Sequence, residues 1–377
     1  MPNLRSLHLP RKDACAVASG FASGDRPTAD LVSAAVEQAL AKAKSSIAGS
    51  VLLLLTSHFG RNTQLAVSTA ARVAHCVQVA GCTAAGVFTE SEWSLDAPAA
   101  AALVLCGDTG LVAPVAGSSV LTLLTATAAQ RLAEPADANV RFGMYCADGE
   151  GDLPARVWSH GRIAGDGNCA LSFSNARTAT RVSRGLKVLS DVMAVTGTDG
   201  YDIFSVDHRP AMATLLDRLP PNSALSPWPP FSQLFAAVTD TPADPTRALK
   251  EGRYHLVPII GVSHDEQSLT LALPLDVGDR LFWTLRQPSI AESDSIEAVA
   301  ELDAVIPEPD FALMFSCIGR GPYFFGSADR DLVCLGERFP AIPILGAYGA
   351  GEIAPVAGKS TCLSYSAVMT LVDCVHT

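Results

Sequence analysis

The chain has 377 residues, of which 49% are hydrophobic and 17% charged, and its formal net charge is −11. This composition supplies a large buried core and excludes long disorder, and the acidic balance argues against a nucleic-acid partner, which needs clustered Lys and Arg. Because 377 residues exceed one ordinary core, we expect about two units.

The sequence carries no sign of export or membrane insertion. The longest apolar stretch, 97–106, is far shorter than the ~20 residues of a membrane span, and no apolar segment follows the basic residues near the N-terminus. The ten cysteines are scattered singly, without a C-x-x-C motif, as is typical of a reducing compartment. We therefore expect a cytoplasmic protein.

In the first half, strands and helices alternate. The patterns predict strands at 15–20, 51–55, 77–80 and 101–106, with helices at 28–44 and 64–76. Strand 51–55 shows no polar alternation, so it should be buried on both faces.

The middle and the second half contain more strands. Strands at 140–146, 170–173, 186–189, 192–196 and 203–206 are expected to form an antiparallel meander. A short helix at 210–219 and a proline-rich linker at 219–230 follow. Strands are then predicted at 254–262, 269–273 and 281–285, and helices at 289–303 and 328–338.

One pattern occurs twice, about 260 residues apart. The apolar strand 51–55 ends in Ser57-His58-Phe59-Gly60-Arg61, and the apolar strand 311–315 ends in Ser316-Cys317-Ile318-Gly319-Arg320. Each is followed by a helix, a strand that breaks into glycines (81–86 and 346–351) and a closing strand (101–106 and 366–372). We therefore predict an α/β protein of two related lobes of mixed β-sheet flanked by helices, with an internal pseudo-repeat.

The repeated strand ends are the predicted ligand site. Glycines at 60, 86, 319 and 351 would let the backbone approach a ligand, and Arg61 and Arg320 offer planar donors that match a carboxylate or phosphate. In the alternative, the glycines only make turns and each arginine pairs with a nearby acid.

Specific chemistry is expected where the two copies differ. His58 stands opposite Cys317 in the repeat, and either residue could be a metal or haem ligand or a nucleophile. Cys317 could also be a structural cysteine. Glu352 follows the second glycine break, where the first copy has Val87; it either contacts a ligand or accepts backbone hydrogen bonds. The turn 161–166 is a secondary candidate for the site wall.

These motifs resemble a known family. The stretches 315–321, 342–346, 351–353, 273–279 and 285–286 resemble the FIST C-terminal domain, and 57–61, 81–86 and 161–166 are similar to the FIST N-terminal domain. The resemblance covers most of residues 13–375 and divides the chain into a FIST N-terminal domain at 13–225 and a FIST C-terminal domain at 226–377.

The resemblance implies a sensory module of a signal-transduction system and no enzyme. Such modules recognise small ligands such as amino acids, and this chain would bind its ligand between its lobes and signal through a separate protein. The arginines of the repeated strand ends favour an amino acid or a carboxylate, and the charge and hydropathy of the chain favour neither a nucleic acid nor a membrane as partner. The expected site comprises Ser57, His58, Gly60, Arg61, Gly86, Ser316, Cys317, Gly319, Arg320, Gly351 and Glu352, with no metal and no cofactor.

Two alternatives remain open. One branch of the family binds haem and senses nitric oxide through a histidine, for which His58 would be the iron ligand here. The other alternative is an enzyme with Cys317 as nucleophile.

Overall fold

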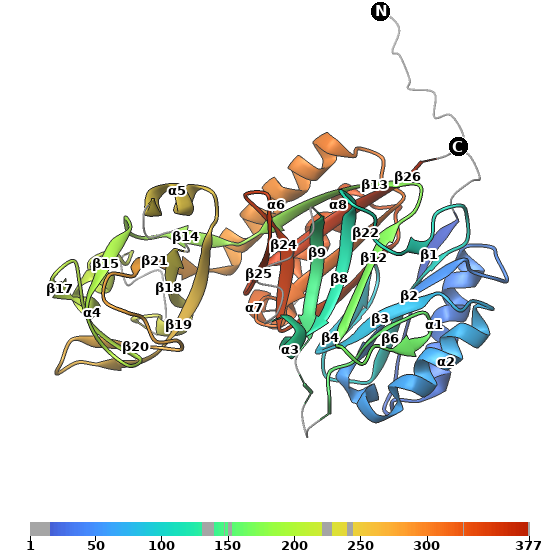
Figure 1. The fold of residues 1–377 in the computed structure, drawn as a ribbon, viewed down its shortest axis with the longest axis horizontal. Coiled ribbons are helices and arrows are strands. Elements are labelled where there is room, and N and C mark those ends of the chain that lie inside the picture. Colours follow the sequence, from blue (N-terminus) through green and yellow to red (C-terminus); the bar gives the residue numbers. More distant parts are fainter. Residues whose placement is uncertain are drawn as a thin grey trace, which may run out of the picture.

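Two related α/β units, a third sheet packed between them and an inserted barrel make up the molecule (Figure 1). The computed structural model describes residues 16–129, 139–146, 148–149, 153–220, 228–239, 244–326 and 328–375. No helix in these ranges is long and apolar enough to cross a membrane. The mixed α/β class predicted from sequence is confirmed.

The first unit is a sheet in the order β1-β6-β2-β3-β10-β11, covered on one face by two helices. Within β2, side chains at 51, 53 and 55 pack against the helices, and those at 52 and 54 face the centre of the molecule, which confirms that this strand is buried on both faces. Its elements are β1 (Val17–Ser23), α1 (Ala29–Lys42), β2 (Ser50–Thr56), the 3₁₀ helix η1 (Ser57–Asn62), α2 (Thr63–Val73), β3 (Val79–Ala84), β6 (Ala99–Leu105), β10 (Val157–Ser159) and β11 (Arg162–Ile163).

The second unit repeats this arrangement in the order β13-β26-β22-β23-β4-β5. In both units two antiparallel pairings are followed by one parallel pairing. Its elements are β13 (Ala176–Ser183), α6 (Pro288–Val305), β22 (Phe311–Cys317), α7 (Pro322–Phe325), α8 (Arg330–Arg338), β23 (Ile344–Gly349) and β26 (Ala367–Cys374), with β4 (Gly86–Thr89) and β5 (Trp93–Ser94) joining from the first half.

Two glycines show that the repeat extends to the backbone. Gly81 pairs with Leu53, and Gly346 pairs with Met314. A Cβ atom on Gly81 would lie 1.7 Å from the carbonyl oxygen of Leu53, and one on Gly346 would lie 2.3 Å from that of Met314. In both units the strand that runs parallel to the central strand, β3 or β23, therefore needs glycine where it passes that central strand.

A third sheet, in the order β25-β24-β9-β8-β12-β7, packs between the two units. One hydrophobic cluster contains residues of all three sheets, such as Leu54, Phe142 and Phe315. The related units therefore share one core. The strands of the third sheet are β7 (Leu111–Val112), β8 (Ser119–Thr125), β9 (Val140–Cys146), β12 (Asn168–Phe173), β24 (Gly351–Val356) and β25 (Lys359–Leu363), and α3 (Ala126–Ala129) follows β8.

Residues 186–286 form a small barrel beside the body of the molecule (Figure 1). The ring β21-β15-β16-β20-β19-β18 closes because β18 pairs again with β21, and apolar side chains such as Trp283 and Val257 fill it. Its elements are β14 (Leu186–Val188), β15 (Met193–Asp199), β16 (Asp202–Val206), β17 (Arg209–Pro210), α4 (Ala211–Leu216), η3 (Phe231–Gln233), β18 (Leu234–Thr239), α5 (Pro245–Lys250), β19 (Tyr254–Ser263), β20 (Ser268–Leu271) and β21 (Arg280–Arg286).

The predicted antiparallel meander is confirmed only for its last two strands, because β15 and β16 pair antiparallel, and it is wrong for the others. β9 pairs in parallel with β8, a strand that the sequence analysis missed, and β12 pairs with the other edge of β8. β13 pairs with β26, almost 200 residues further along. Part of the predicted linker, 221–227, lies outside the described residues. The division into domains at 225/226 stays a prediction.

Candidate functional site

The first copy of the repeated motif lies at the surface, in η1. Arg61 is exposed, and Ser57 and His58 are half-buried. His58 Nδ1 lies 3.2 Å from Thr56 Oγ1. A Cβ atom on Gly60 would lie 3.1 Å from Leu153 Cβ, so this glycine allows close packing of the chain.

The second copy lies in a different local structure. Ser316 and Cys317 are still part of β22, and Cys317 pairs with Gly349 as Thr56 pairs with Ala84 in the first unit. Cys317 therefore corresponds structurally to Thr56, and the alignment of Cys317 with His58 is wrong by two residues.

Arg320 is buried and fully engaged within the protein. Its side chain is 1% exposed, and Nε and Nη2 donate to the two carboxylate oxygens of Asp331 at 2.7 and 3.0 Å. The guanidinium also donates to Ser183 O, Ser183 Oγ, Ala291 O and Ser295 Oγ. Of the two roles considered for this arginine, the structure supports pairing with an acid and argues against ligand binding.

A second acid lies beside this network. Asp329 begins α8 and accepts hydrogen bonds from the backbone of Asp331 and Leu332 and from Tyr348 Oη, the last at 2.7 Å. Burial, and then the nearby Asp331 carboxylate, raise the pKa of Asp329 to about 7.

Tyrosine rings occupy the space that the motif glycines leave open. A Cβ atom on Gly319 would lie 3.0 Å from the ring of Tyr365, and one on Gly351 would lie 2.2 Å from Tyr145 Oη. The expectation that these two glycines open space for a ligand is therefore wrong, because the protein's own side chains fill it.

Gly86, at the start of β4, is enclosed by protein atoms. A Cβ atom there would lie 2.5 Å from both Leu95 Cδ2 and Ser94 O, and 2.9 Å from the Tyr348 ring. This glycine, too, serves close packing.

Glu352 is the least satisfied ionisable side chain of the predicted set. It is 0% exposed, and its Oε2 accepts hydrogen bonds from Ser366 Oγ at 2.6 Å and Ser366 N at 3.2 Å. Its Oε1 is buried and has no hydrogen-bond partner in the described part of the chain. Burial raises the pKa of Glu352 to about 8. A buried acceptor without a partner costs stability, so such a group needs a reason.

Cys317 lies near this carboxylate. The residue is 4% exposed. Burial first, and then the charge of Glu352, raise the pKa of its thiol to about 12. A nucleophilic cysteine must be a thiolate. The environment of Cys317 therefore favours a structural thiol.

Two further arginines approach this region from the barrel side. Arg286 is 6% exposed and donates from Nη2 to Gly319 O at 3.1 Å. Its guanidinium lies over the rings of Phe235, Phe324 and Tyr365, an arrangement that stabilises a cation. Burial lowers its pKa to about 10.

Arg184 is the other arginine. It donates to Tyr254 O at 3.0 Å and lies over the Tyr254 ring, and its buried Nε has no partner. Among the described residues, neither Arg184 nor Arg286 forms a salt bridge with a carboxylate.

The two arginines mark the places where the chain crosses between body and barrel. Arg184 precedes β14 and Arg286 ends β21, directly before α6. Gly185, at φ +61°, and Ser183 both donate to Asp294 Oδ2 in α6, which fixes the first crossing to the body. We call the region around both crossings, Glu352, Cys317 and Gly319 the junction.

The structure brings together only part of the predicted site. The second-copy residues and Glu352 meet at the junction, whereas the recorded hydrogen bonds of the two motif copies share no partner in the described part of the chain. Sequence reasoning missed Arg184 and Arg286. Arg286 fell in a stretch that resembles the family, but an arginine at a strand end carries no signal of burial.

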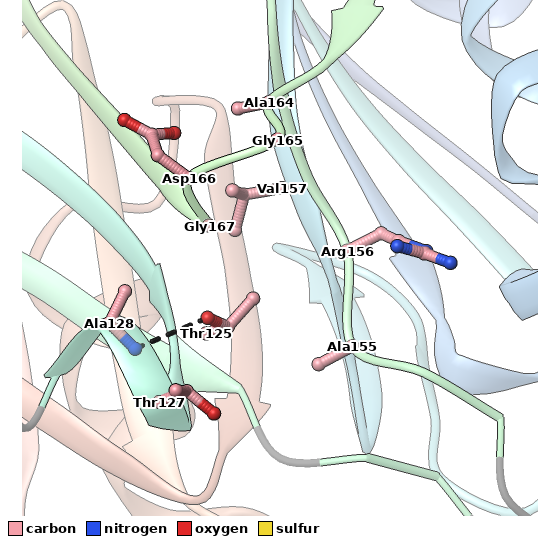
Figure 2. A pocket seen from close by; sticks show the side chains of 10 residues that line it. All are labelled: Thr125, Thr127, Ala128, Ala155, Arg156, Val157, Ala164, Gly165, Asp166 and Gly167. Atoms are coloured by element: carbon pink, nitrogen blue, oxygen red, sulfur yellow. Dashed lines mark hydrogen bonds between the residues drawn. The ribbon is translucent and has the colours of Figure 1, made fainter.

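The secondary candidate, the turn 161–166, lies elsewhere. This turn borders a pocket of about 210 Å³. Figure 2 shows that Ala128 N donates to Thr125 Oγ1 in this pocket and that the side chain of Arg156 extends away from both. The pocket contains no residue of the junction. Its walls are Thr125, Thr127, Ala128, Ala155, Arg156, Val157, Ala164, Gly165, Asp166 and Gly167.

The expected absence of a metal or cofactor and the haem alternative with His58 both stay predictions. No group of three or more His, Cys, Asp or Glu side chains in those ranges could hold a metal ion. A pocket of about 250 Å³ beside η1 contains none of the His, Cys, Met or Tyr side chains that ligate haem iron; its walls are Pro27, Thr28, Ala29, Phe59, Asn62, Leu65 and Ala66.

Comparison with known proteins points to one family for the C-terminal part. An uncharacterized protein of Mycobacterium tuberculosis is 26% identical over 221 residues, and one of Mycobacterium bovis is 27% identical over the same length. Each alignment covers 57% of this chain and 56% of the relative, so the chain spans about half the length of the curated relatives it matches. The FIST N-terminal domain stays a prediction. The family model of the FIST C domain matches residues 214–355, a range that runs from α4 in the barrel through Glu352.

Proposed function

We propose that this chain is a sensory module that binds a small ligand at the junction. The matched FIST C domain belongs to a class of sensory domains of signalling systems, and the match includes both Arg286 and Glu352. The cysteines at 76, 82, 146, 169, 317, 334 and 362 are free thiols, which supports a cytoplasmic location.

The observation that carries the proposal is the pairing state of Glu352. A carboxylate that is 0% exposed keeps one oxygen without a partner among the described residues, while the buried Arg286 and the half-buried Arg184 nearby form no salt bridge with a described carboxylate. A purely structural acid of this kind would normally be paired, as Asp331 is with Arg320. A ligand that bonds to Glu352, Arg184 and Arg286 would supply the partners that these three side chains lack.

The position of the junction explains how binding would become a signal. In the described residues two chain crossings connect the barrel to the body, and Arg286 joins the rings of Phe324 and Tyr365 in the body to Phe235 in the barrel. A ligand that engages Arg286 would shift the barrel relative to the body, and a separate signalling protein would read that shift.

A thermal-shift screen with amino acids and small carboxylic acids tests this proposal. A ligand at 100 times its dissociation constant adds about 2.7 kcal/mol to the free energy of unfolding. We expect Arg286→Gln to abolish the shift and Arg61→Gln, in the exposed first copy, to retain it. Glu352→Leu is a second junction variant that should also lose the shift. A ligand that stabilises all variants equally would refute the site.

The enzyme alternative has no specific observation in its favour. The raised pKa keeps the Cys317 thiol protonated at neutral pH. In the described residues, no hydrogen bond joins this thiol to a side chain that could act as a general base. We therefore do not propose a reaction.

A further inference from the structure

The hydrogen bonds of Glu352 determine where a proton on this carboxyl group must lie. Oε2 accepts two hydrogen bonds from Ser366, at 2.6 and 3.2 Å. Both donors need a lone pair on that oxygen. With Ser366 as the donor of both bonds, a proton on the group occupies Oε1, the buried oxygen that has no partner among the described residues.

The surroundings favour this protonated form. No described arginine forms a salt bridge with Glu352. Burying a carboxylate without a counter-ion costs free energy, so the protonated form is favoured. The ionisable groups that interact with it electrostatically are Tyr145 of β9, Cys317 of β22, Cys362 of β25, Arg184 after β13, Arg286 of β21 and Arg320 after β22.

With Glu352 protonated, the junction presents hydrogen-bond donors. Among the described residues, Oε1–H has no acceptor, and Arg286 donates one hydrogen bond, from Nη2 to Gly319 O. The thiol of Cys317 is also a weak donor. A group that can satisfy such donors must itself be an acceptor, and an oxyanion would also balance the charge of Arg286.

We propose that the ligand presents an oxyanion of the carboxylate class to the junction, that Glu352 donates its Oε1–H to it, and that binding is therefore linked to the uptake of a proton. This inference rests on the proposed function and narrows its ligand class. An ammonium group, which would need an ionised Glu352, is excluded from this position.

The linkage fixes the direction of the pH dependence. Above a pKa of about 8, free Glu352 loses its proton, so affinity for an oxyanion should fall by about tenfold per pH unit. The pKa values of Cys317, at about 12, and Arg286, at about 10, lie above this range. Asp329, with a pKa of about 7, also titrates nearby, so a variant must identify the group.

Calorimetric titration with acetate as the anion probe and methylammonium as the cation probe, from about pH 6 to about pH 9, is the test. We expect acetate to bind wild type with an affinity that falls above pH 8, and proton uptake to show as a dependence of the heat on the buffer. Glu352→Gln should bind acetate independently of pH, because the amide Nε2–H replaces the Oε1–H. Circular dichroism checks that the variant is folded, and Asp329→Asn should keep the wild-type profile.

Several results would overturn the inference. The first is that wild type binds methylammonium more tightly as the pH rises. The second is that the affinity of wild type for acetate does not change with pH, and the third is that acetate does not bind at all. If a metabolite from the screen still binds in a manner that needs Arg286, the proposed function survives while the oxyanion inference fails. If no metabolite binds, both fail.

Discussion

The two copies of the repeated motif have similar sequences and very different surroundings. Arg61 is exposed in η1, whereas Arg320 is buried and bound to Asp331. The copies are also offset by two residues relative to their strands, since Cys317 ends β22 and His58 lies beyond the end of β2. A shared motif therefore does not define a shared site, and the residues outside the repeat, Glu352 and Arg286, have the environment of a ligand site.

The largest effect should come from the arginines of the two copies. Arg320→Ala leaves Asp331 buried without its counter-ion, which should cost about 3–5 kcal/mol in the free energy of unfolding. Arg61→Ala should change it by no more than about 0.5 kcal/mol. Urea denaturation of both variants measures the difference. Similar losses in the two variants would contradict the comparison.

Replacing the glycine of β3 or the matching glycine of β23 should lower the stability of the protein to a similar extent. A Cβ atom at Gly81 or Gly346 meets a carbonyl oxygen of the central strand, so replacement by Ala should destabilise by at least about 1–3 kcal/mol. Gly336, in α8, has no atom within 4 Å of its Cβ position. Gly336→Ala is therefore the matched control and should stabilise by about 0.5–1 kcal/mol. Unchanged thermal stability in only one of the two strand variants would show that the repeat is not structural.

Glu352, which the first copy replaces by Val87, should make the free energy of unfolding depend on pH. Its pKa is about 8 in the folded protein against an ordinary value of 4.5, so the folded state holds more protons between these values. The contribution of Glu352 to stability is present below about pH 4.5 and is lost as the pH rises to about 8. Denaturation of Glu352→Gln across this range should show a shallower decline than wild type. Asp329 has the same sign, so some decline should persist, and parallel profiles would count against the assignment.

Cysteine reactivity should show the smallest effect. Iodoacetamide reacts with thiolates, and Cys317 is buried with a pKa of about 12, whereas Cys362 is exposed. Mass spectrometry of the native protein should find Cys362 modified first. Preferential modification of Cys317 would restore the nucleophile hypothesis.

The sequence predicts the features that depend on local pattern. Both-face burial of 51–55 follows from its unbroken apolar run, and the repeat follows from the recurring strand and helix lengths. The barrel was not predictable in this way, because its closure rests on β18 pairing with β21, over 40 residues away. The pairing of β13 with β26 is equally distant in sequence.

The same limit applies to the site. Glu352 could be singled out because the first copy has Val87 in its place. Arg320 was misjudged because its partners come from Ser183, Ala291, Ser295 and Asp331, which no sequence spacing brings together. Arg286 was missed because its burial depends on rings from both the barrel and the body.

Hydrogen exchange with and without the most stabilising metabolite of the screen tests the central claim most directly. Backbone amides exchange their hydrogens more slowly where a bound ligand orders the chain. We predict added protection in the segments 284–288, 317–321 and 351–366 of the junction, with no change in 57–62. Protection confined to 57–62 would place the ligand at the exposed first copy and contradict the assignment of the junction as the site.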